Sequence, residues 1–200
     1  MHLDKNNFRQ AAFNRRMALA PDARAEWSAQ MMARFLSQVD LPPAGAVISG
    51  YVPVNNEIDV IPLMTELVAR GYRCAVPYNM EREQVLSFLE WTPDTVLLRG
   101  LYNIPQPDPA KADVLVPNLL IVPMVAFDAE CGRIGYGSGY FDRTFAHLAK
   151  IQKFRAIGVA FEAQKYDRVP VDRYDYRLDA VVTETATYGT AAPVQGKQTT

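Results

Sequence analysis

The sequence predicts a single α/β domain, Rossmann-like in type, in which helices flank a mostly parallel β-sheet. Residues 46–52 and 73–77 are short, β-branched and apolar, as expected of buried strands, and residues 59–70 between them have a helical pattern. A strand, a crossover helix and a second strand form a βαβ unit, whose two strands pair in parallel. Residues 119–122 are a continuous apolar run, which is typical of a strand covered on both faces.

Each further element is expected from its own pattern. A first helix has Asp4 as its N-cap, and a second helix begins at Pro21 and runs to about residue 37. The helix of the βαβ unit is capped by Asp59 and ends at Gly71. The apolar face of the first helix is expected to consist of Phe8, Ala11, Ala12, Met17 and Leu19. Further strands are expected at 85–91, 156–161 and 178–183, a further helix at 140–150, and a loop with three prolines at 100–110.

The chain length suits one domain. A chain of 200 residues is long enough to bury roughly 70% of the surface that it exposes when unfolded. Residues 186–200 are small and polar and show no periodicity. We therefore expect one domain over residues 1–185, followed by a disordered tail over residues 186–200.

The composition excludes several classes of function. The net charge is −1, so no broad electrostatic attraction to nucleic acid or to an anionic membrane is expected. No apolar run approaches the roughly 20 residues that span a bilayer, and the first residues lack the apolar core of a signal peptide. Two cysteines and two histidines are too few for a disulfide framework or a zinc site. We expect a cytoplasmic monomer that binds small molecules and has no nucleic-acid or membrane partner.

The most informative segment is the glycine-rich stretch at residues 131–143. It holds four glycines in eight residues, three of them on alternate positions from Gly135 to Gly139. Glycine adopts positive φ freely, so successive N–H groups can curl around one anion, and the helix that follows favours a phosphate at its N-terminus. Arg133 adds a forked donor for phosphate oxygens, and Asp142 could hold Mg²⁺. The stretch therefore predicts a phosphate site.

The alternative is a tight strand-to-helix turn that is merely rich in glycine. Two glycines alone would favour that turn, but four glycines flanked by Arg133 and Asp142 favour the phosphate site. The spacing is not the dinucleotide fingerprint G-x-G-x-x-G, and no Gly-Lys-Ser/Thr follows, as a P-loop would require.

Residues 122–128 and 132–143 resemble the signature of the 5-formyltetrahydrofolate cyclo-ligase family. Three further segments agree with that family in order and spacing: residues 5–9 with Arg15, residues 52–59 and residues 102–107. The resemblance extends over about residues 5–184. It implies an α/β fold of the sugar-isomerase and CoA-transferase type. It also implies a reaction in which MgATP converts 5-formyltetrahydrofolate into 5,10-methenyltetrahydrofolate, ADP and phosphate.

The resemblance also implies roles for individual residues, with Mg²⁺ as cofactor and ATP and a reduced folate as substrates. The implied catalytic residues are Arg133, Tyr140 and Lys5. The implied ATP-binding residues are Lys5, Asn6, Asn7, Phe8, Arg9, Arg133, Ile134, Gly135, Tyr136, Gly137, Ser138, Gly139, Tyr140 and Phe141. The implied folate-binding residues are Val52, Glu57, Tyr102 and Tyr140, and the implied Mg²⁺ ligands are Asp142 and Asp179.

Without the resemblance, several of these residues have ordinary alternatives. Lys5 and Arg9 lie one helical turn apart, so they can face the same phosphates or form a solvated helix face. Glu57 could be an exposed turn residue, Tyr140 could pack in the core at a helix start, and Asp179 could be a strand-end residue.

The chain departs from the family pattern at two places. Tyr78 and Asn79 follow Pro77 where a basic residue is frequent, and Tyr136 and Ser138 occupy positions of the glycine loop that are often basic. Main-chain amides and the metal must then do more of the phosphate binding. Three competing functions remain: a non-catalytic nucleotide- or folate-binding member of the same fold, a sugar-phosphate isomerase, and an RNA-binding protein. The isomerase would need a proton-transfer carboxylate that we cannot place, and the RNA-binding protein would need basic patches with interleaved aromatics.

Overall fold

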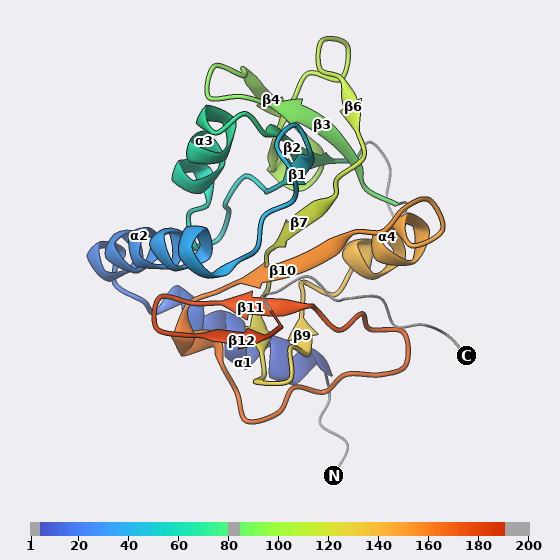
Figure 1. Ribbon diagram of the computed structural model, residues 1–200. Helices are drawn as coiled ribbons and strands as arrows, with labels where there is room; N and C mark the ends of the chain where they lie inside the picture. Colours follow the sequence, from blue (N-terminus) through green and yellow to red (C-terminus); the bar gives the residue numbers. More distant parts are fainter. Residues whose placement is uncertain (1–4, 80–84, 191–200) are drawn as a thin grey trace.

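The computed structural model describes residues 5–79 and 85–190, apart from the side chain of Tyr102. Within these ranges the main sheet consists of β1 (Val47–Ser49), β2 (Arg73–Tyr78), β3 (Ser87–Trp91), β6 (Val114–Leu115), β7 (Leu119–Val122), β10 (Arg155–Val159), β11 (Ala180–Val182) and β12 (Thr187–Gly189). Their order across the sheet is β12-β11-β10-β7-β1-β2-β3-β6 (Figure 1). The strands from β11 to β2 are parallel, and β12, β3 and β6 pair antiparallel at the two edges. The mostly parallel α/β domain is confirmed.

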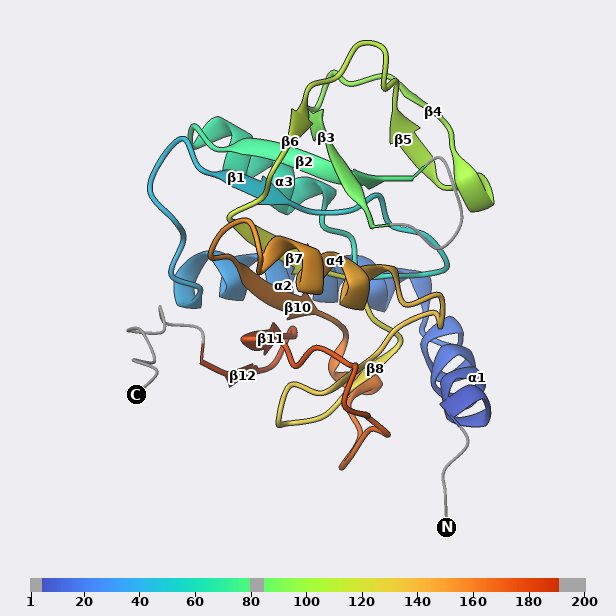
Figure 2. The ribbon, with the colours of Figure 1, turned by 90° about the vertical axis from the view of Figure 1, so that its right-hand side faces the viewer.

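Helices cover both faces of this sheet. The helices are α1 (Lys5–Met17), α2 (Pro21–Gln38), α3 (Ile61–Ala69) and α4 (Tyr140–Leu148). Helices α2 and α3 lie on one face and α4 on the other (Figures 1 and 2). Leu119 and Ile121 of β7 pack in the cluster under α2 and α3, whereas Leu120 and Val122 pack under α4. This burial on both faces explains the unbroken apolar run. Among the described residues, no helix combines the length and the hydrophobicity needed to cross a bilayer.

The βαβ unit forms as its sequence predicts. The backbone N–H of Ile61 donates to Asp59 Oδ1 at 2.9 Å, which fixes the turn just before α3. The N-cap position itself is Val60, which makes no side-chain cap hydrogen bond, so the expected cap at Asp59 is wrong by one residue. Helix α3 ends before Gly71, whose φ of +88° is the left-handed conformation of a helix terminator. Strand β1 is shorter than the expected 46–52. The expected cap at Asp4 lies outside the described residues.

Helix α1 buries only part of the expected face: Ala12 is buried, and Phe8 and Leu19 pack against the core. Ala11 and Met17 are exposed, so their assignment to the apolar face is wrong. The buried residues are Ala12 and Arg16, and α1 packs against β8 (Ala126–Phe127) and η2 (Glu162–Gln164). The hydrophobic pattern was misleading because a buried position on this face carries an arginine.

The expected loop at 100–110 contains regular structure. Strand β4 (Leu97–Arg99) pairs antiparallel with β5 (Pro105–Pro107), and a short 3₁₀ helix, η1 (Leu101–Asn103), connects them. Proline lacks an N–H and is therefore confined to edge strands, and β5 has only one partner strand in this two-stranded sheet. Two of the three prolines, Pro105 and Pro107, lie in an edge strand here, so the prediction of a plain loop was wrong.

The expected tail is also shorter than predicted, because β12 pairs with β11 across the predicted domain boundary. The hydroxyl of Thr183 accepts hydrogen bonds from the backbone N–H groups of Thr185 and Ala186, at 3.3 and 3.0 Å. These bonds form the turn that reverses the chain. A side-chain turn of this kind leaves no periodicity, so the sequence pattern did not reveal it. Residues 191–200 lie outside the described ranges.

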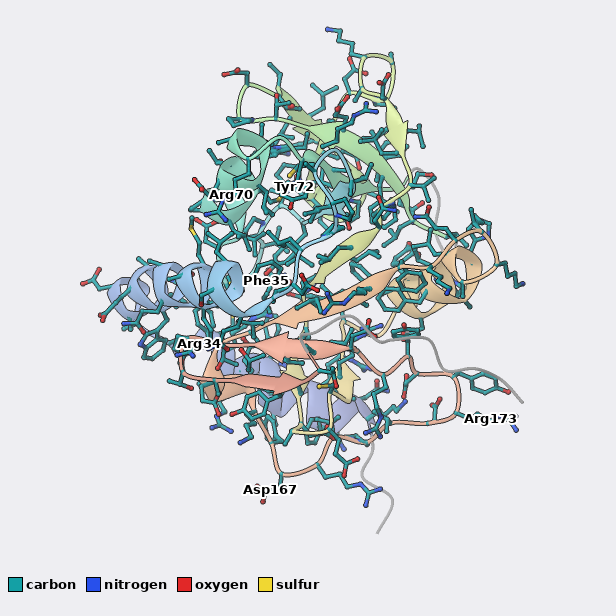
Figure 3. All side chains as sticks on the ribbon, viewed as in Figure 1. Arg34, Phe35, Arg70, Tyr72, Asp167 and Arg173 are labelled. Atoms are coloured by element: carbon teal, nitrogen blue, oxygen red, sulfur yellow. The ribbon has the colours of Figure 1, made fainter. Side chains whose placement is uncertain are left out.

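Truncation of Phe35 should lower the stability of the fold. Phe35 of α2 is 0% exposed in the cluster between α2, α3 and the sheet (labelled in Figure 3). We expect Phe35→Ala to reduce the free energy of unfolding by about 3–5 kcal/mol, measured by urea denaturation. Val96→Ala is the control, because Val96 is 77% exposed. Equal midpoints for the two variants would contradict this assignment of the core.

Candidate active site

A cleft of about 830 Å³ opens at the carboxyl ends of β1, β2 and β7. Tyr51 and Val52 line it just beyond β1, Tyr78 lines it at the end of β2, and Pro123 lines it after β7. The remaining walls come from α1, from the β4–β5 hairpin and from the glycine-rich segment. In open α/β sheets, the carboxyl ends of the strands are the usual place for a ligand.

The glycine loop, residues 135–139, connects β9 (Arg133–Ile134) to α4. Gly137 and Gly139 have φ of +102° and +65°, and Gly139 is the residue from which α4 starts. A Cβ on Gly137 would lie 3.0 Å from Arg9 Cζ, so the left-handed φ and the close approach of Arg9 both favour glycine there. Residues 136–138 are exposed on the cleft. Exposed N–H groups just before a helix make this loop a suitable anion site.

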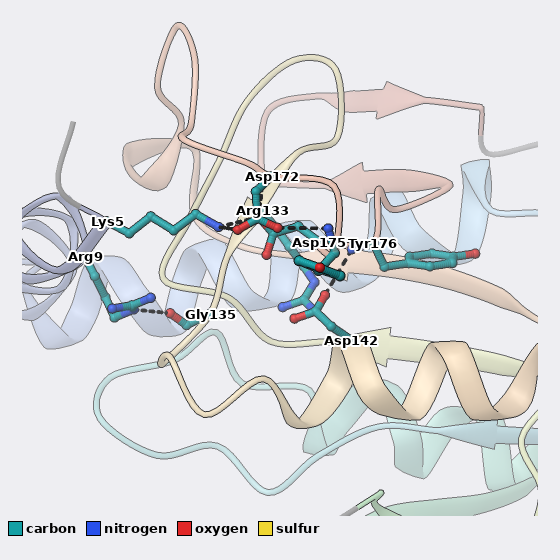
Figure 4. A network of polar contacts seen from close by, with 9 residues as sticks. Lys5, Arg9, Arg133, Gly135, Asp142, Asp172, Asp175 and Tyr176 are labelled. Atoms are coloured by element: carbon teal, nitrogen blue, oxygen red, sulfur yellow. Dashed lines mark hydrogen bonds and ion pairs between the residues drawn. The ribbon is translucent and has the colours of Figure 1, made fainter. Parts of the chain in front are cut away.

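Two cations of α1 approach the cleft beside this loop (Figure 4). Arg9 Nε donates to the carbonyl oxygen of Gly135 at 2.8 Å, which fastens the loop to the helix. Lys5 Nζ lies 2.8 Å from Asp172 Oδ2 and 2.5 Å from Asp175 Oδ2. Burial acts to lower the pKa of Lys5, but the bonds to the two carboxylates outweigh it and raise the pKa. Lys5 is therefore charged and already paired.

Arg133 lies deeper in the same wall. Its side chain is 4% exposed, and its Nη2 lies 2.7 Å from Asp142 Oδ1, at the start of α4. Asp142 Oδ1 also accepts the backbone N–H of Tyr176 at 3.0 Å. Burial lowers the pKa of Arg133, and the charges of Asp142 and Asp175 oppose that shift. The two ends of the glycine loop are thus joined by an ion pair.

A second polar chain crosses the cleft wall from Arg16 to Glu57. Arg16 Nη2 donates to Tyr136 Oη, and Tyr136 Oη donates to Glu57 Oε1, each at 2.6 Å. Glu57 Oε2 accepts the backbone N–H of Val54 at 2.9 Å. Burial raises the pKa of Glu57, while the bonds from Tyr136 and Val54 and the charge of Arg16 act to lower it. The sequence prediction missed Arg16, since a buried arginine has no pattern of its own.

The structure brings most of the predicted site residues together, but not all. The cleft is lined by Lys5, Arg9, Val52, Glu57 and residues 133–142. Asn6, Asn7 and Phe8 are not among the lining residues, and the ring of Phe8 packs 4.7 Å from that of Tyr166 instead. Tyr102 belongs to η1 beside the cleft, but its side chain is not among those that the structure describes.

Asp179 does not reach the cleft. Its Oδ2 accepts the backbone N–H of Ala156 at 2.7 Å, at the amino ends of β10 and β11, whereas the cleft lies at the carboxyl ends of the parallel strands. Asp175 lines the cleft together with Asp142, and nothing in its sequence context distinguishes it from Asp172 or Asp179. The described residues contain no cluster of three or more metal-ligating side chains. Any metal here would rest on two carboxylates and on the oxygens of its ligand.

Tyr140 lines the cleft at the first position of α4. Within the described part of the chain, its buried hydroxyl has no hydrogen-bond partner. A buried hydroxyl without a partner is costly, so a bound ligand that accepts its hydrogen bond would be favoured. The cleft therefore brings together the glycine loop, the carboxylate of Glu57 and the hydroxyl of Tyr140.

Comparisons with known proteins agree on one family. A family model described as the 5-formyltetrahydrofolate cyclo-ligase family matches residues 2–184. The 5-formyltetrahydrofolate cyclo-ligase of Escherichia coli (strain K12) is 31% identical over 173 residues, which are 84% of this chain and 94% of that protein. The protein of the same name from Mycolicibacterium smegmatis is 27% identical over 185 residues, which are 90% of this chain and 93% of that protein.

Solved structures agree with this result. The structure of 5,10-methenyltetrahydrofolate synthetase from Aquifex aeolicus is similar, with a TM-score of 0.76 and 28% identity, and the match covers 98% of this chain and 96% of that one. The synthetase from Mycoplasma pneumoniae has a TM-score of 0.72 and 22% identity, and the match covers 91% of this chain and 99% of that one. At 22% identity, the similarity to the Mycoplasma pneumoniae protein shows a shared fold only.

Removal of Asp142 should destabilise the protein more than removal of Lys5. Asp142→Ala leaves the buried guanidinium of Arg133 without its carboxylate. We expect a loss of roughly 2–3 kcal/mol in the free energy of unfolding, somewhat below that for a fully buried pair. Lys5→Ala is the control, because the side chain of Lys5 is 31% exposed, against 4% for Arg133, and pairs of exposed charges contribute little. Urea denaturation measures both, and equal losses would show that the Arg133 pair does not stabilise the loop.

Proposed function

The chain belongs to the 5-formyltetrahydrofolate cyclo-ligase family, and we propose that its cleft carries out the reaction of that family. The reaction converts 5-formyltetrahydrofolate and ATP into 5,10-methenyltetrahydrofolate, ADP and phosphate. The observation that carries the proposal is that the glycine loop and the buried carboxylate of Glu57 open on one cleft. A nucleotide phosphate and a reduced folate can therefore meet there.

The reaction requires the nucleotide phosphate and the reduced folate to lie next to each other. The oxygen of the formyl group on N5 is a poor leaving group, so N10 cannot displace it directly from the formyl carbon. In the proposed reaction the formyl oxygen bonds to the γ-phosphorus, and the bond from that phosphorus to ADP breaks. N10 then attacks the formyl carbon and loses its proton, while phosphate leaves with the former formyl oxygen. The site has to align the γ-phosphate with the formyl oxygen and to stabilise the transferring charge.

The nucleotide phosphates would bind on the side of the cleft formed by α1 and the glycine loop. The N–H groups of residues 135–139 would donate to phosphate oxygens at the N-terminus of α4. Lys5 and Arg133 would add charge, as the resemblance implies, and Arg9 would hold the loop through its bond to Gly135. Lys5 is already bound to Asp172 and Asp175, so an incoming phosphate would have to compete with these carboxylates.

The folate would bind on the opposite side. A pterin ring presents an amino group and an adjacent N–H, and the carboxylate of Glu57 can accept both. Val52 lines the same wall. The free hydroxyl of Tyr140 would orient the formyl group between the two substrates.

Two of the carboxylates that line the cleft, those of Asp142 and Asp175, suit a magnesium ion that arrives with ATP. Mg²⁺ is commonly held by one or two carboxylates together with substrate phosphates, and Asp142 and Asp175 line the cleft next to Arg133. When bound, the ion would neutralise charge on the transferring phosphoryl group. Asp179 is left out of this proposal because its carboxylate is engaged at the other edge of the sheet.

We also propose that the protein is a cytoplasmic monomer with no nucleic-acid partner. Cys74 and Cys131 are buried free thiols, which suits a reducing compartment. The net charge of −1 gives no general attraction for a nucleic-acid backbone.

The direct test is the formation of product. With MgATP and 5-formyltetrahydrofolate, the purified protein should develop the near-ultraviolet absorbance of the methenyl product, and ADP should appear in equal amount. Omission of either substrate is the control. An unchanged spectrum with intact ATP would refute the activity and favour a binding protein of the same fold.

The proposed metal ligands can be separated by magnesium titration. We expect Asp175→Asn to raise the Mg²⁺ concentration for half-maximal activity by roughly tenfold or more, since it removes a proposed ligand. Asp179→Asn is the matched control and should leave that concentration unchanged. A shift in the Asp179 variant without a shift in the Asp175 variant would reverse the assignment.

A further inference from the structure

We propose that Tyr136 is a positioning residue for the folate, and that its hydroxyl holds the carboxylate of Glu57 in the orientation that receives the pterin ring. Arg16, buried beneath it, holds Tyr136 in turn. The inference rests on the proposed function, because it assumes that Glu57 faces the pterin.

The geometry of Tyr136 is unusual for a loop residue. The residue is 42% exposed and lines the cleft, but its hydroxyl meets two largely buried partners. Arg16 donates to that hydroxyl and Glu57 accepts from it, so the oxygen uses both its donor and an acceptor site. A side chain fixed at its tip in this way has one defined orientation.

Arg16 donates one hydrogen bond to the hydroxyl of Tyr136 and another to the main chain. The residue is 0% exposed, and its Nη1 donates to the carbonyl oxygen of Met124 at 3.0 Å. Its guanidinium lies 5.5 Å from the ring centres of both Phe13 and Tyr136. None of the ion pairs in the described ranges joins Arg16 to a carboxylate. The charge of Arg16 therefore reaches Glu57 through the hydroxyl of Tyr136, which such a cation polarises.

The carboxylate of Glu57 is held at both oxygens and still has room for a ligand. Tyr136 donates to Oε1, and the backbone N–H of Val54 donates to Oε2. An ionised carboxylate offers about four acceptor sites, so each oxygen keeps one for an incoming donor. The two remaining sites match two adjacent donors on one ring edge, which is what a pterin presents. Without the hydroxyl, the carboxylate would be held only from the side of Val54.

The same contact favours the charged form of Glu57. Burial raises its pKa, and the hydrogen bonds from Tyr136 and Val54 and the charge of Arg16 oppose the rise. The other titratable group facing it is the hydroxyl of Tyr51, whose pKa burial raises well above its ordinary value. Loss of the Tyr136 hydroxyl removes a bond to the charged form, so the pKa of Glu57 must rise further. As the pH is lowered, folate binding that needs the carboxylate would then be lost at a higher pH than in the unchanged protein.

Tyr136 also connects the glycine loop to Glu57. Its backbone is part of the glycine loop, between Gly135 and Gly137, while its side chain holds Glu57. One residue thus touches both the proposed nucleotide side and the proposed folate side. Tyrosine at this position, where family members often carry a basic residue, connects the two sides without adding charge to the loop.

The first experiment compares two substitutions that each remove one hydroxyl. We expect Tyr136→Phe to raise the dissociation constant for 5-formyltetrahydrofolate by about tenfold or more, because a bond to a charged group is lost. The affinity for an ATP analogue should change less than twofold. Tyr72→Phe is the matched control, since the hydroxyl of Tyr72 donates to Pro42 at 2.9 Å and does not line the cleft. Calorimetry measures each ligand alone, and circular dichroism confirms that both variants fold.

The second experiment combines Tyr136→Phe with Glu57→Gln. If Tyr136 acts through Glu57, the double variant should bind folate about as weakly as Glu57→Gln alone. The acid limb of folate binding should also move to higher pH in Tyr136→Phe, a change that loss of packing would not produce. Losses that multiply in the double variant would mean that Tyr136 contacts the folate independently, and would overturn the proposal.

The outcomes separate this inference from the proposed function. Normal folate binding by Glu57→Gln would show that Glu57 does not bind the folate, and would refute the premise of this inference. Weak binding by Glu57→Gln together with normal binding by Tyr136→Phe would leave the proposed function intact and refute the positioning role.

Discussion

The ion pair between Arg133 and Asp142 closes the glycine loop at its base, and the arrangement of the cleft depends on it. Arg133 lies in the last strand before the loop and Asp142 in the first turn of the helix after it, so the 2.7 Å contact joins the two ends. The loop residues between them line the cleft, and residues 136–138 are exposed there. The bond from the backbone of Tyr176 to the same oxygen of Asp142 brings in the segment that carries Asp175. One buried guanidinium thus organises the loop, the helix start and a distant carboxylate.

The cleft is balanced in charge before any ligand binds. Lys5 is paired with Asp172 and Asp175, Arg133 with Asp142, and Arg16 acts on Glu57 through Tyr136. Unpaired cations so close together would repel one another and would pay a desolvation penalty in the wall. Under the proposed function, a phosphate-bearing ligand would bind by exchange: its oxygens would replace carboxylates at the cations, and a metal ion would take the carboxylates that are released. Such an exchange would allow a protein with a net charge of −1 to provide a local anion site.

The sequence alone predicted the parallel centre of the fold and the glycine loop, because both depend on local patterns. The apolar run at β7, the glycine that ends α3 and the spacing of the glycines in the loop each reflect a backbone requirement that few other residues satisfy. The predictions failed where a position is determined by tertiary contact. Arg16 is buried because Tyr136 and Met124 lie over it, Asp175 reaches the cleft because Tyr176 is bound to Asp142, and β12 forms because the hydroxyl of Thr183 turns the chain. No periodicity marks any of these three, so only the structure reveals them.

The pairing of Lys5 with Asp172 and Asp175 spans 167 and 170 positions of the chain. During vectorial synthesis the first helix leaves the ribosome long before its partners exist, and it has no cleft to face until they arrive. The central strands can associate earlier, because their neighbours are closer in sequence. Under the proposed function, ligand capture would therefore be a property of the nearly finished polypeptide, and reduced folate or nucleotide would protect the folded protein without engaging its unfinished precursors.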